Sequence, residues 1–160
     1  MASAQSDGLV IKSSAFKHNG DIPKVFTCQG KDTSPPLEWD HAPKGTKTFA
    51  LIVDDPDAPD PKNPQRTWVH WVLYNIPLNV KALAENIQAL PPGAKDGLND
   101  WKRSGYGGPC PPIGRHRYFH KLFALDKELT FKSTPTKAEL EAAMEGHILG
   151  RAELIGTYQK

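Results

Sequence analysis

Three short segments of the chain bring together residue types that can do chemistry. Residues 54–59 (DDPDAP) hold carboxylates on a stiff backbone, because each proline fixes φ and removes an amide donor. Residues 68–71 (WVHW) hold one imidazole among large apolar side chains, and residues 107–118 (GGPCPPIGRHRY) lead from a Gly/Pro loop into a strand. Two carboxylates, two imidazoles and a phenol beside a rigid rim predict a concave site for a small ligand.

The last of these segments has a spacing that orients its side chains. His116 and Tyr118 are two positions apart, so in a strand they point to the same face. Arg117 points to the opposite face, where we expect a structural ion pair. Gly107 and Gly108 lack a Cβ and therefore allow the backbone to approach a ligand closely. The segment thus predicts an imidazole and a phenol that face one common site.

Each segment also has an ordinary structural interpretation. Asp55 and Asp57 can simply end a strand in an Asx-type turn. A histidine such as His70 in an apolar strand is more often a core residue with a buried partner, and the Gly/Pro loop can be an exposed surface loop. The remaining histidines have no motif around them, and we interpret them as solvated or structural (His18, His41, His120 and His147).

The composition predicts a single ordered domain over residues 1–160. Charged residues make up 24% and hydrophobic residues 38%, and no stretch reaches the roughly 20 apolar residues that span a bilayer. The net charge of +2 gives no argument for nucleic acid. Residues 1–8 lack the basic and apolar regions of a signal peptide, so we expect a cytoplasmic protein. Because no GxSxG, Walker, GxGxxG or HExxH motif occurs, we expect no cofactor and no metal.

Apolar, β-branched runs predict the strands, and Pro and Gly predict the loops between them. The predicted strands cover residues 8–16, 47–54, 67–76, 117–125 and 152–158. Residues 55–66 contain four prolines and predict a loop, whereas residues 80–88 predict a helical turn or two. Residues 91–114 form a long irregular stretch, which is typical of functional loops.

One α-helix is predicted over residues 136–149. Thr136 and Glu139 fit a capping box, in which each side chain accepts from the other residue's backbone amide. Four residues then recur on one helical face, ahead of a glycine that fits a C-terminal cap (Leu140, Met144, His147, Ile148 and Gly150). Strands separated by loops, with one late helix, predict a mainly β fold, a β-sandwich with small peripheral helices.

The two cysteines leave two interpretations open. Cys28 and Cys110 lie 82 positions apart and form no CxxC pair, which excludes zinc-ribbon and thioredoxin-like sites. In a cytoplasmic protein we favour two reduced thiols. A Cys28–Cys110 disulfide is the alternative, because the sequence does not place the two Cα atoms relative to each other.

The three segments, in this order, resemble the phosphatidylethanolamine-binding protein family. DPDAP at 55–59, WVHW at 68–71 and GPCPPIGRHRY at 108–118 match the signature regions of that family. Residues 28–39 (CQGKDTSPPLEW) and 152–158 (AELIGTY) resemble its bacterial and archaeal branch, the Raf-kinase-inhibitor-like proteins.

This resemblance extends over about residues 8–158 and implies two antiparallel sheets in Greek-key connection with small flanking helices. It implies a pocket for small anions such as phosphate, phosphorylethanolamine-like headgroups and acetate. Family members with known roles act as signalling adaptors or inhibit kinases or proteases, mostly without catalysis, so we expect a binding protein rather than an enzyme. Matched motif by motif, the implied lining residues are Asp55, Asp57, Pro59, His70, Gly108, Pro112, His116 and Tyr118.

Carboxylates in such a pocket repel a phosphate unless protons intervene. A phosphate monoester has a second pKa near 6, so its monoanion keeps one P–OH group that can donate to a carboxylate. We therefore expect His70, His116 and Tyr118 to donate to the anion. Asp55 is expected to accept or to orient a histidine, and Asp57 to line the pocket or to brace its loop.

Two other functions use the same residues. A hydrolase would use an Asp–His base, with Cys110 as the tempting nucleophile despite its flanking prolines. A divalent metal would take oxygen and nitrogen ligands from Asp55, Asp57, His70 and His116. No amphipathic basic helix supports membrane association, and exposed edge strands leave room for a homodimer.

Overall fold

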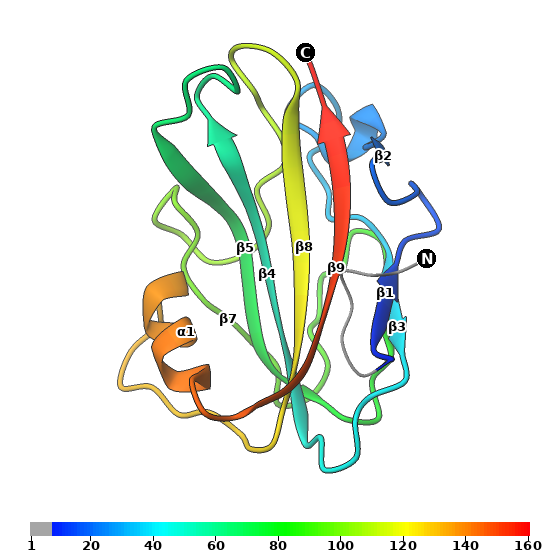
Figure 1. Ribbon diagram of the computed structural model, residues 1–160, viewed down its shortest axis with the longest axis vertical. Coiled ribbons are helices and arrows are strands. Elements are labelled where there is room, and N and C mark those ends of the chain that lie inside the picture. The colour runs from blue at the N-terminus through cyan, green and yellow to red at the C-terminus, as the bar shows by residue number, and fades with distance from the viewer. Residues whose placement is uncertain (1–7) are drawn as a thin grey trace.

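The computed structural model describes residues 8–160, so the prediction about a signal peptide rests on residues that lie outside it. Two β-sheets pack together, one with the strand order β2-β9-β8-β4-β5-β7 and one with the order β1-β3-β6 (Figure 1). The strands are β1 (Val10–Lys12), β2 (Gly20–Asp21), β3 (Leu37–Asp40), β4 (Thr48–Ala58), β5 (Arg66–Pro77), β6 (Ala82–Leu83), β7 (Lys95–Asp96), β8 (His116–Leu125) and β9 (Ile148–Tyr158). The helical elements are a 3₁₀ turn, η1 (Lys24–Phe26), and one α-helix, α1 (Lys137–Met144). The predicted mainly β fold with two sheets is confirmed.

Four long strands form the centre of the larger sheet. β4 and β5 form an antiparallel hairpin, and after a long connection β8 returns to pair with β4 on its other side. β9 then pairs antiparallel along the whole of β8. The prediction of purely antiparallel sheets needs one correction, because β2 makes a short parallel pairing with β9.

The apolar runs form strands because both faces of the larger sheet are covered. Along β5, Trp71 and Leu73 point into the core between the two sheets, whereas Val72 points into a second core. That second core lies under α1, whose Leu140 and Met144 are buried against the sheet. A strand buried on both faces reads as a continuous apolar run rather than an alternating one.

The predicted helix is present but shorter than expected. Its capping box between Thr136 and Glu139 is confirmed. The helix ends at Met144, because Gly146 adopts the left-handed conformation (φ 84°) and β9 then begins. His147 and Gly150 therefore do not belong to the helix, and the final strand starts earlier than predicted. No helix among residues 8–160 is long and apolar enough to cross a bilayer.

Three further predictions about local structure are wrong in part. The loop predicted over residues 55–66 starts later, because β4 continues to Ala58. Pro56 lies at a register shift between the paired residues Asp55 and Ala58, where a strand tolerates a proline. Residues 80–88 form no helical turn; Leu83 is buried in the short strand β6 instead. The first strand is limited to β1, three residues within the predicted range 8–16.

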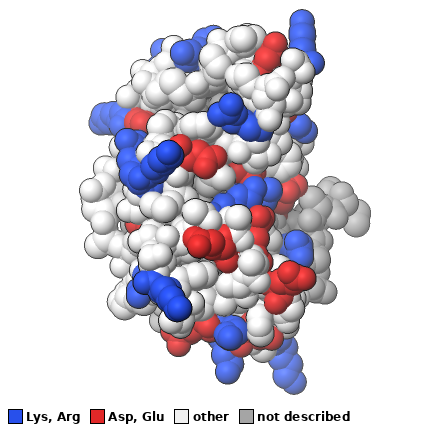
Figure 2. All heavy atoms as spheres, turned by 90° about the vertical axis from the view of Figure 1, so that its left-hand side faces the viewer, with Lys and Arg blue, Asp and Glu red and all other residues white. Residues whose placement is uncertain are grey.

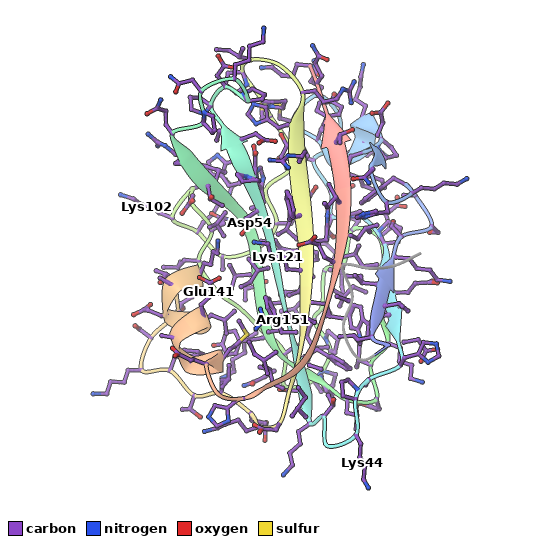
Figure 3. All side chains as sticks on the ribbon, in the orientation of Figure 1. Lys44, Asp54, Lys102, Lys121, Glu141 and Arg151 are labelled. Carbon is purple, nitrogen blue, oxygen red and sulfur yellow. A yellow bond between two sulfur atoms is a disulfide. The ribbon has the colours of Figure 1, made fainter. Side chains whose placement is uncertain are left out.

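A buried carboxylate ties α1 to the sheet. Asp54 is 1% exposed, and its Oδ2 accepts hydrogen bonds from Lys121 Nζ (3.0 Å) and Lys137 Nζ (2.7 Å). Lys121 lies on β8 and Lys137 is the first residue of α1, so one acid joins two strands and the helix (Figure 3). Asp54 points to the face of the sheet that carries α1, whereas the neighbouring Asp55 points to the opposite face.

Cys28 and Cys110 are joined by a disulfide, with their Cα atoms 5.4 Å apart. The favoured interpretation of two reduced thiols is therefore corrected. The physical reason is a set of contacts between distant loops, because Cys28 donates its amide to the Pro109 carbonyl (3.0 Å) and Tyr106 donates its hydroxyl to the Phe26 carbonyl (2.7 Å). The fold brings the two loops together, and the separation of the two cysteines in the sequence does not indicate this.

Removing this bridge is expected to lower stability without unfolding the protein. A disulfide that closes a long loop contributes about 2–4 kcal/mol, whereas domains of this kind have 5–15 kcal/mol. We expect the double variant Cys28→Ser/Cys110→Ser to lose about 2–4 kcal/mol of unfolding free energy in urea titrations. Dithiothreitol should produce the same loss in the wild type and none in the variant. An unchanged urea midpoint in the variant would contradict the expectation.

Candidate ligand-binding pocket

A cavity of about 480 Å³ opens at one end of the larger sheet. It lies where β4 ends and where β5 and β8 begin, at the upper end of these strands in Figure 1. Its lining residues are Asp55, Ala58, Pro59, Arg66, Trp68, His70, Trp101, Cys110, Pro111, Pro112, His116 and Tyr118. Six of the eight predicted site residues are thus brought together here. Asp57 and Gly108 do not line the cavity.

Asp55 and His116 form a buried pair at the base of the cavity. His116 Nδ1 lies 2.6 Å from Asp55 Oδ2, and the other carboxylate oxygen accepts the Asp57 amide (2.7 Å). His116 Nε2 faces two carbonyl oxygens, Ile113 O at 2.9 Å and Pro59 O at 3.1 Å. Carbonyls only accept hydrogen bonds, so Nε2 carries a proton.

The partners of His116 fix the number of protons that the pair holds. Since Nε2 is protonated, the short contact at Nδ1 requires one more proton, either on that nitrogen or on Asp55. Burial raises the pKa of Asp55, although the hydrogen bond from His116 opposes this effect. The pair therefore acts as a neutral unit, and neither nitrogen of His116 is free to contact a ligand. The prediction that His116 donates to the anion is corrected.

His70 presents a lone pair to the cavity rather than a proton. Its Nδ1 donates to the Gly107 carbonyl at 2.7 Å, which fixes the tautomer and leaves Nε2 as an acceptor. Burial lowers the pKa of His70 from its ordinary value of 6.5 to about 4, and the hydrogen bond to Gly107 only partly opposes this. His70 is thus neutral at physiological pH. The predicted donor role of His70 is replaced by an acceptor role.

The hydroxyl group of Tyr118 has no hydrogen-bond partner within residues 8–160, although it is buried. The residue is 1% exposed and its ring packs edge-on against His70 and parallel to His116. Burial raises the pKa of Tyr118, so the phenol keeps its proton and is a donor. A buried donor without a partner is uncommon and indicates a site that something else completes.

Asp57 is committed to Arg117 on the opposite side of the strand. Its carboxylate accepts from the Arg117 guanidinium at 2.9 and 3.0 Å and from the Arg117 amide at 2.9 Å. These bonds hold the pKa of Asp57 below its usual range. The ion pair predicted for Arg117 is confirmed, and Asp57 braces the loop instead of lining the cavity.

The glycines of the third segment serve packing rather than direct contact. Gly108 is buried and donates its amide to Asp32 Oδ1 at 2.8 Å. A methyl group on Gly107 would overlap the ring of Trp101, and one on Gly108 would overlap the Phe26 carbonyl. The close approach that a glycine permits is therefore used to pack the loop onto its neighbours.

Two aromatic rings and an arginine of the pocket were not predicted as site residues. Trp68 and Trp101 meet edge-to-face at 5.5 Å, and Trp101 also packs on His70 at 5.2 Å. Arg66 is exposed at the mouth and supplies a positive charge. One feature of the sequence points to Trp101, since it is an aromatic residue within the irregular stretch 91–114. It lies two positions after Asn99, whose side chain accepts the Trp101 amide in a turn. Arg66 has none, because its place depends on where β5 begins.

The charged side chains on one face of the molecule form no second site. Figure 2 shows the side of the molecule that lies to the left in Figure 1, where basic and acidic side chains alternate without a continuous patch of one sign. Within residues 8–160 no group of three or more His, Cys, Asp or Glu residues could hold a metal ion. The other four histidines lie outside the pocket, and His120, the deeply buried one, donates to backbone carbonyls.

Comparison with known proteins places this chain among a defined set of relatives. The family model "Phosphatidylethanolamine-binding protein" matches residues 12–159. A UPF0098 protein of Methanothermobacter thermautotrophicus is 47% identical over 153 residues, covering 94% of this chain and 98% of the relative. A UPF0098 protein of Aquifex aeolicus is also 47% identical, over 92% of this chain and 86% of the relative.

Solved structures agree with these sequence relatives. A phosphatidylethanolamine-binding protein homologue of Chlamydia trachomatis is 42% identical with a TM-score of 0.88, covering 97% of this chain and 99% of that one. YbcL of E. coli is 32% identical with a TM-score of 0.86, over 96% and 99% of the two chains. The carboxypeptidase Y inhibitor, solved with its cognate proteinase, shares only the fold at 17% identity and a TM-score of 0.60, over 94% of this chain and 82% of that one.

Two buried histidines are expected to make the protein sensitive to mild acid. Burial lowers the pKa of His70 and of His120 to about 4, whereas an unfolded histidine titrates near 6.5. Between these values the unfolded chain binds more protons, so stability is complete above about pH 6.5 and falls as the pH drops toward 4. Each residue contributes up to about 3 kcal/mol to this loss, while the raised pKa of Asp55 acts in the opposite direction.

Thermal unfolding followed between pH 7 and pH 4 checks this expectation. The melting temperature should fall steadily below about pH 6.5, and His120→Gln should show about half of the wild-type slope because it lacks one of the two groups. A melting temperature that is flat from pH 6.5 to 4.5 would contradict the assignment of two neutral buried imidazoles.

Proposed function

The chain belongs to the phosphatidylethanolamine-binding protein family, and we propose that it binds a small oxyanion in this pocket without catalysing a reaction. The observation that carries the proposal is Tyr118, which lines the cavity and whose buried hydroxyl has no hydrogen-bond partner within residues 8–160. Such a donor requires an acceptor, and an anionic oxygen forms the strongest hydrogen bond with it. Arg66 at the mouth adds the positive charge that attracts an anion.

The protonation states of the pocket residues define the ligand further. The neutral Asp55–His116 pair removes the repulsion that a bare carboxylate would exert. Tyr118 then donates to one phosphate oxygen, and the P–OH group of a phosphate monoanion donates to the Nε2 lone pair of His70. A phosphate monoester monoanion satisfies both atoms, whereas acetate or sulfate satisfies only the donor.

The walls of the pocket suit the substituent of such an ester. The cavity is larger than a phosphate group, and Trp68, Trp101 and the flanking prolines supply an apolar surface. An ammonium headgroup of the phosphorylethanolamine type would rest on the aromatic faces by cation–π attraction. Asp55 and Asp57 offer it no unbalanced charge, because His116 neutralises the first carboxylate and Arg117 the second.

The hydrolase and metal alternatives find no supporting observation. A general base needs a free nitrogen that takes up a proton near neutral pH. His116 Nε2 is held by two carbonyls, and burial lowers the pKa of His70, whose Nε2 is free, to about 4. Cys110 lies in a disulfide and offers no thiolate. Asp57 and His116, two of the four suggested metal ligands, are fully engaged elsewhere. We therefore carry neither function forward.

A regulatory role is the wider part of this proposal. We propose that residues 8–158 act as one domain that recognises a phosphorylated ligand or a protein partner such as a kinase or protease. Its relative in fold, the carboxypeptidase Y inhibitor, was solved with its proteinase. Trp101 (38% exposed) and Ile113 (53% exposed) flank the mouth and offer apolar contacts to such a partner. A cytoplasmic location fits this proposal only if the disulfide forms transiently there.

Removing the Tyr118 hydroxyl is expected to weaken binding and leave the fold intact. Tyr118→Phe should bind inorganic phosphate about tenfold more weakly by calorimetry, since a hydrogen bond to a charged group contributes about 1.5 kcal/mol. Its unfolding free energy should not fall, because the lost hydroxyl has no protein partner.

Tyr106→Phe is the matched control. Its hydroxyl bonds the Phe26 carbonyl outside the cavity, so this variant should lose about 1 kcal/mol of stability and keep its phosphate affinity. Wild-type affinity in Tyr118→Phe would sink the proposal.

Phosphate binding is expected to weaken as the pH rises from 6 to 8. The phosphate loses the proton that it donates to His70, because its second ionisation falls within this range. His70 does not titrate here, since its pKa is about 4. Sulfate, which carries no proton, should bind more weakly than phosphate at pH 6. Calorimetric affinity for phosphate that is flat or rises over this range would contradict the account.

A further inference from the structure

The disulfide forms part of the pocket wall. Cys110 lines the cavity together with Pro111 and Pro112, and both cysteines are exposed. The bridge therefore connects the wall to the loop after η1. Any change in the bond acts directly on the surface that a ligand touches.

Hydrogen bonds hold the loop firmly only up to the cysteine. Tyr106, Gly108 and Pro109 are bonded to the segment 26–32. Among the described residues, no main-chain amide from Cys110 to Arg115 donates to a main-chain carbonyl. The Ile113 carbonyl contacts His116, and the Arg115 side chain contacts Asp21 and Thr157. Within the described residues the disulfide is thus the only covalent tether of the wall, which is otherwise held by the Ile113–His116 contact and by the Arg115 side chain.

We propose that Cys28–Cys110 is a redox switch that sets the affinity of the pocket for its anion. The switch is reduced when a thiolate of an external dithiol attacks one sulfur of the bridge and forms a mixed disulfide. The second thiolate of the dithiol then displaces the protein sulfur from this mixed disulfide. The products are two protein thiols and the oxidised dithiol, with two electrons and two protons transferred to the protein. Exposed disulfides are the ones that such exchange reaches.

Reduction lowers affinity because it allows the wall to leave its binding position. The apparent dissociation constant for phosphate is inversely proportional to the fraction of molecules in which the wall has its binding arrangement. If, without the bridge, residues 110–115 occupy that arrangement about one tenth of the time, binding weakens about tenfold. The remaining hydrogen bonds of residues 106–109 keep the rest of the loop and both sheets in place.

The inference rests on the proposed anion binding, and the first test measures both separately. Calorimetry with inorganic phosphate at pH 6 compares the oxidised wild type, the wild type in dithiothreitol and the double variant Cys28→Ser/Cys110→Ser. We expect about tenfold weaker binding in the second and third samples, and no effect of dithiothreitol on the variant. Far-UV circular dichroism should be the same in all three.

Linkage supplies a second test that needs no variant. If oxidation strengthens phosphate binding tenfold, saturating phosphate must stabilise the disulfide by the same factor. In buffers of oxidised and reduced dithiothreitol, the potential for half-reduction should fall by about 30 mV with phosphate and not with chloride of equal ionic strength.

The possible outcomes separate the two claims. Equal phosphate affinity in oxidised and reduced protein, or an unshifted potential, overturns the switch and leaves anion binding standing. Absence of phosphate binding in the oxidised wild type overturns both. Loss of the β-sheet signal on reduction also overturns the switch, because the bridge would then support the whole fold and not the wall alone.

Discussion

The geometry of the pocket depends on one buried contact, the hydrogen bond between Asp55 and His116. Asp55 lies at the irregular end of β4 and His116 is the first residue of β8, so their contact joins the two strands where the cavity opens. Because His116 Nε2 also holds the carbonyls of Pro59 and Ile113, one imidazole ties together both proline-rich loops of the rim. The charge of the site follows from the same contact, since two acceptors for Nε2 force an additional proton into the pair.

Much of the fold and the grouping of most of the pocket residues could be predicted from the sequence. The apolar runs identified the long strands, and the two-residue spacing of His116 and Tyr118 placed both side chains on the cavity side. The same spacing predicted the opposite role of Arg117, which pairs with Asp57. These features depend on local periodicity, and local periodicity is what a single sequence contains.

The chemical roles could not be predicted, because they depend on partners distant in the chain. The tautomer of His70 is decided by the Gly107 carbonyl, 37 positions away, and that of His116 by Pro59, 57 positions away. Trp101 reaches the pocket only because a loop folds over Gly107, and Cys28 reaches Cys110 across 82 positions. The helix end was misplaced because the pairing of β9 with β8 outweighed the helical pattern of Ile148.

The central claim is that the pocket offers an oxyanion one donor, Tyr118, and one acceptor, His70. Both nitrogens of the neighbouring His116 are already bonded to protein groups. Nitrogen-15 NMR of the imidazole rings at pH 7 tests this most directly, because ring shifts report which nitrogen carries a proton. The account predicts that His70 has a protonated Nδ1 and a bare Nε2 whose shift moves when phosphate is added, while His116 keeps a protonated Nε2 throughout. A bare Nε2 on His116, or a protonated Nε2 on His70 that phosphate leaves unchanged, would contradict it.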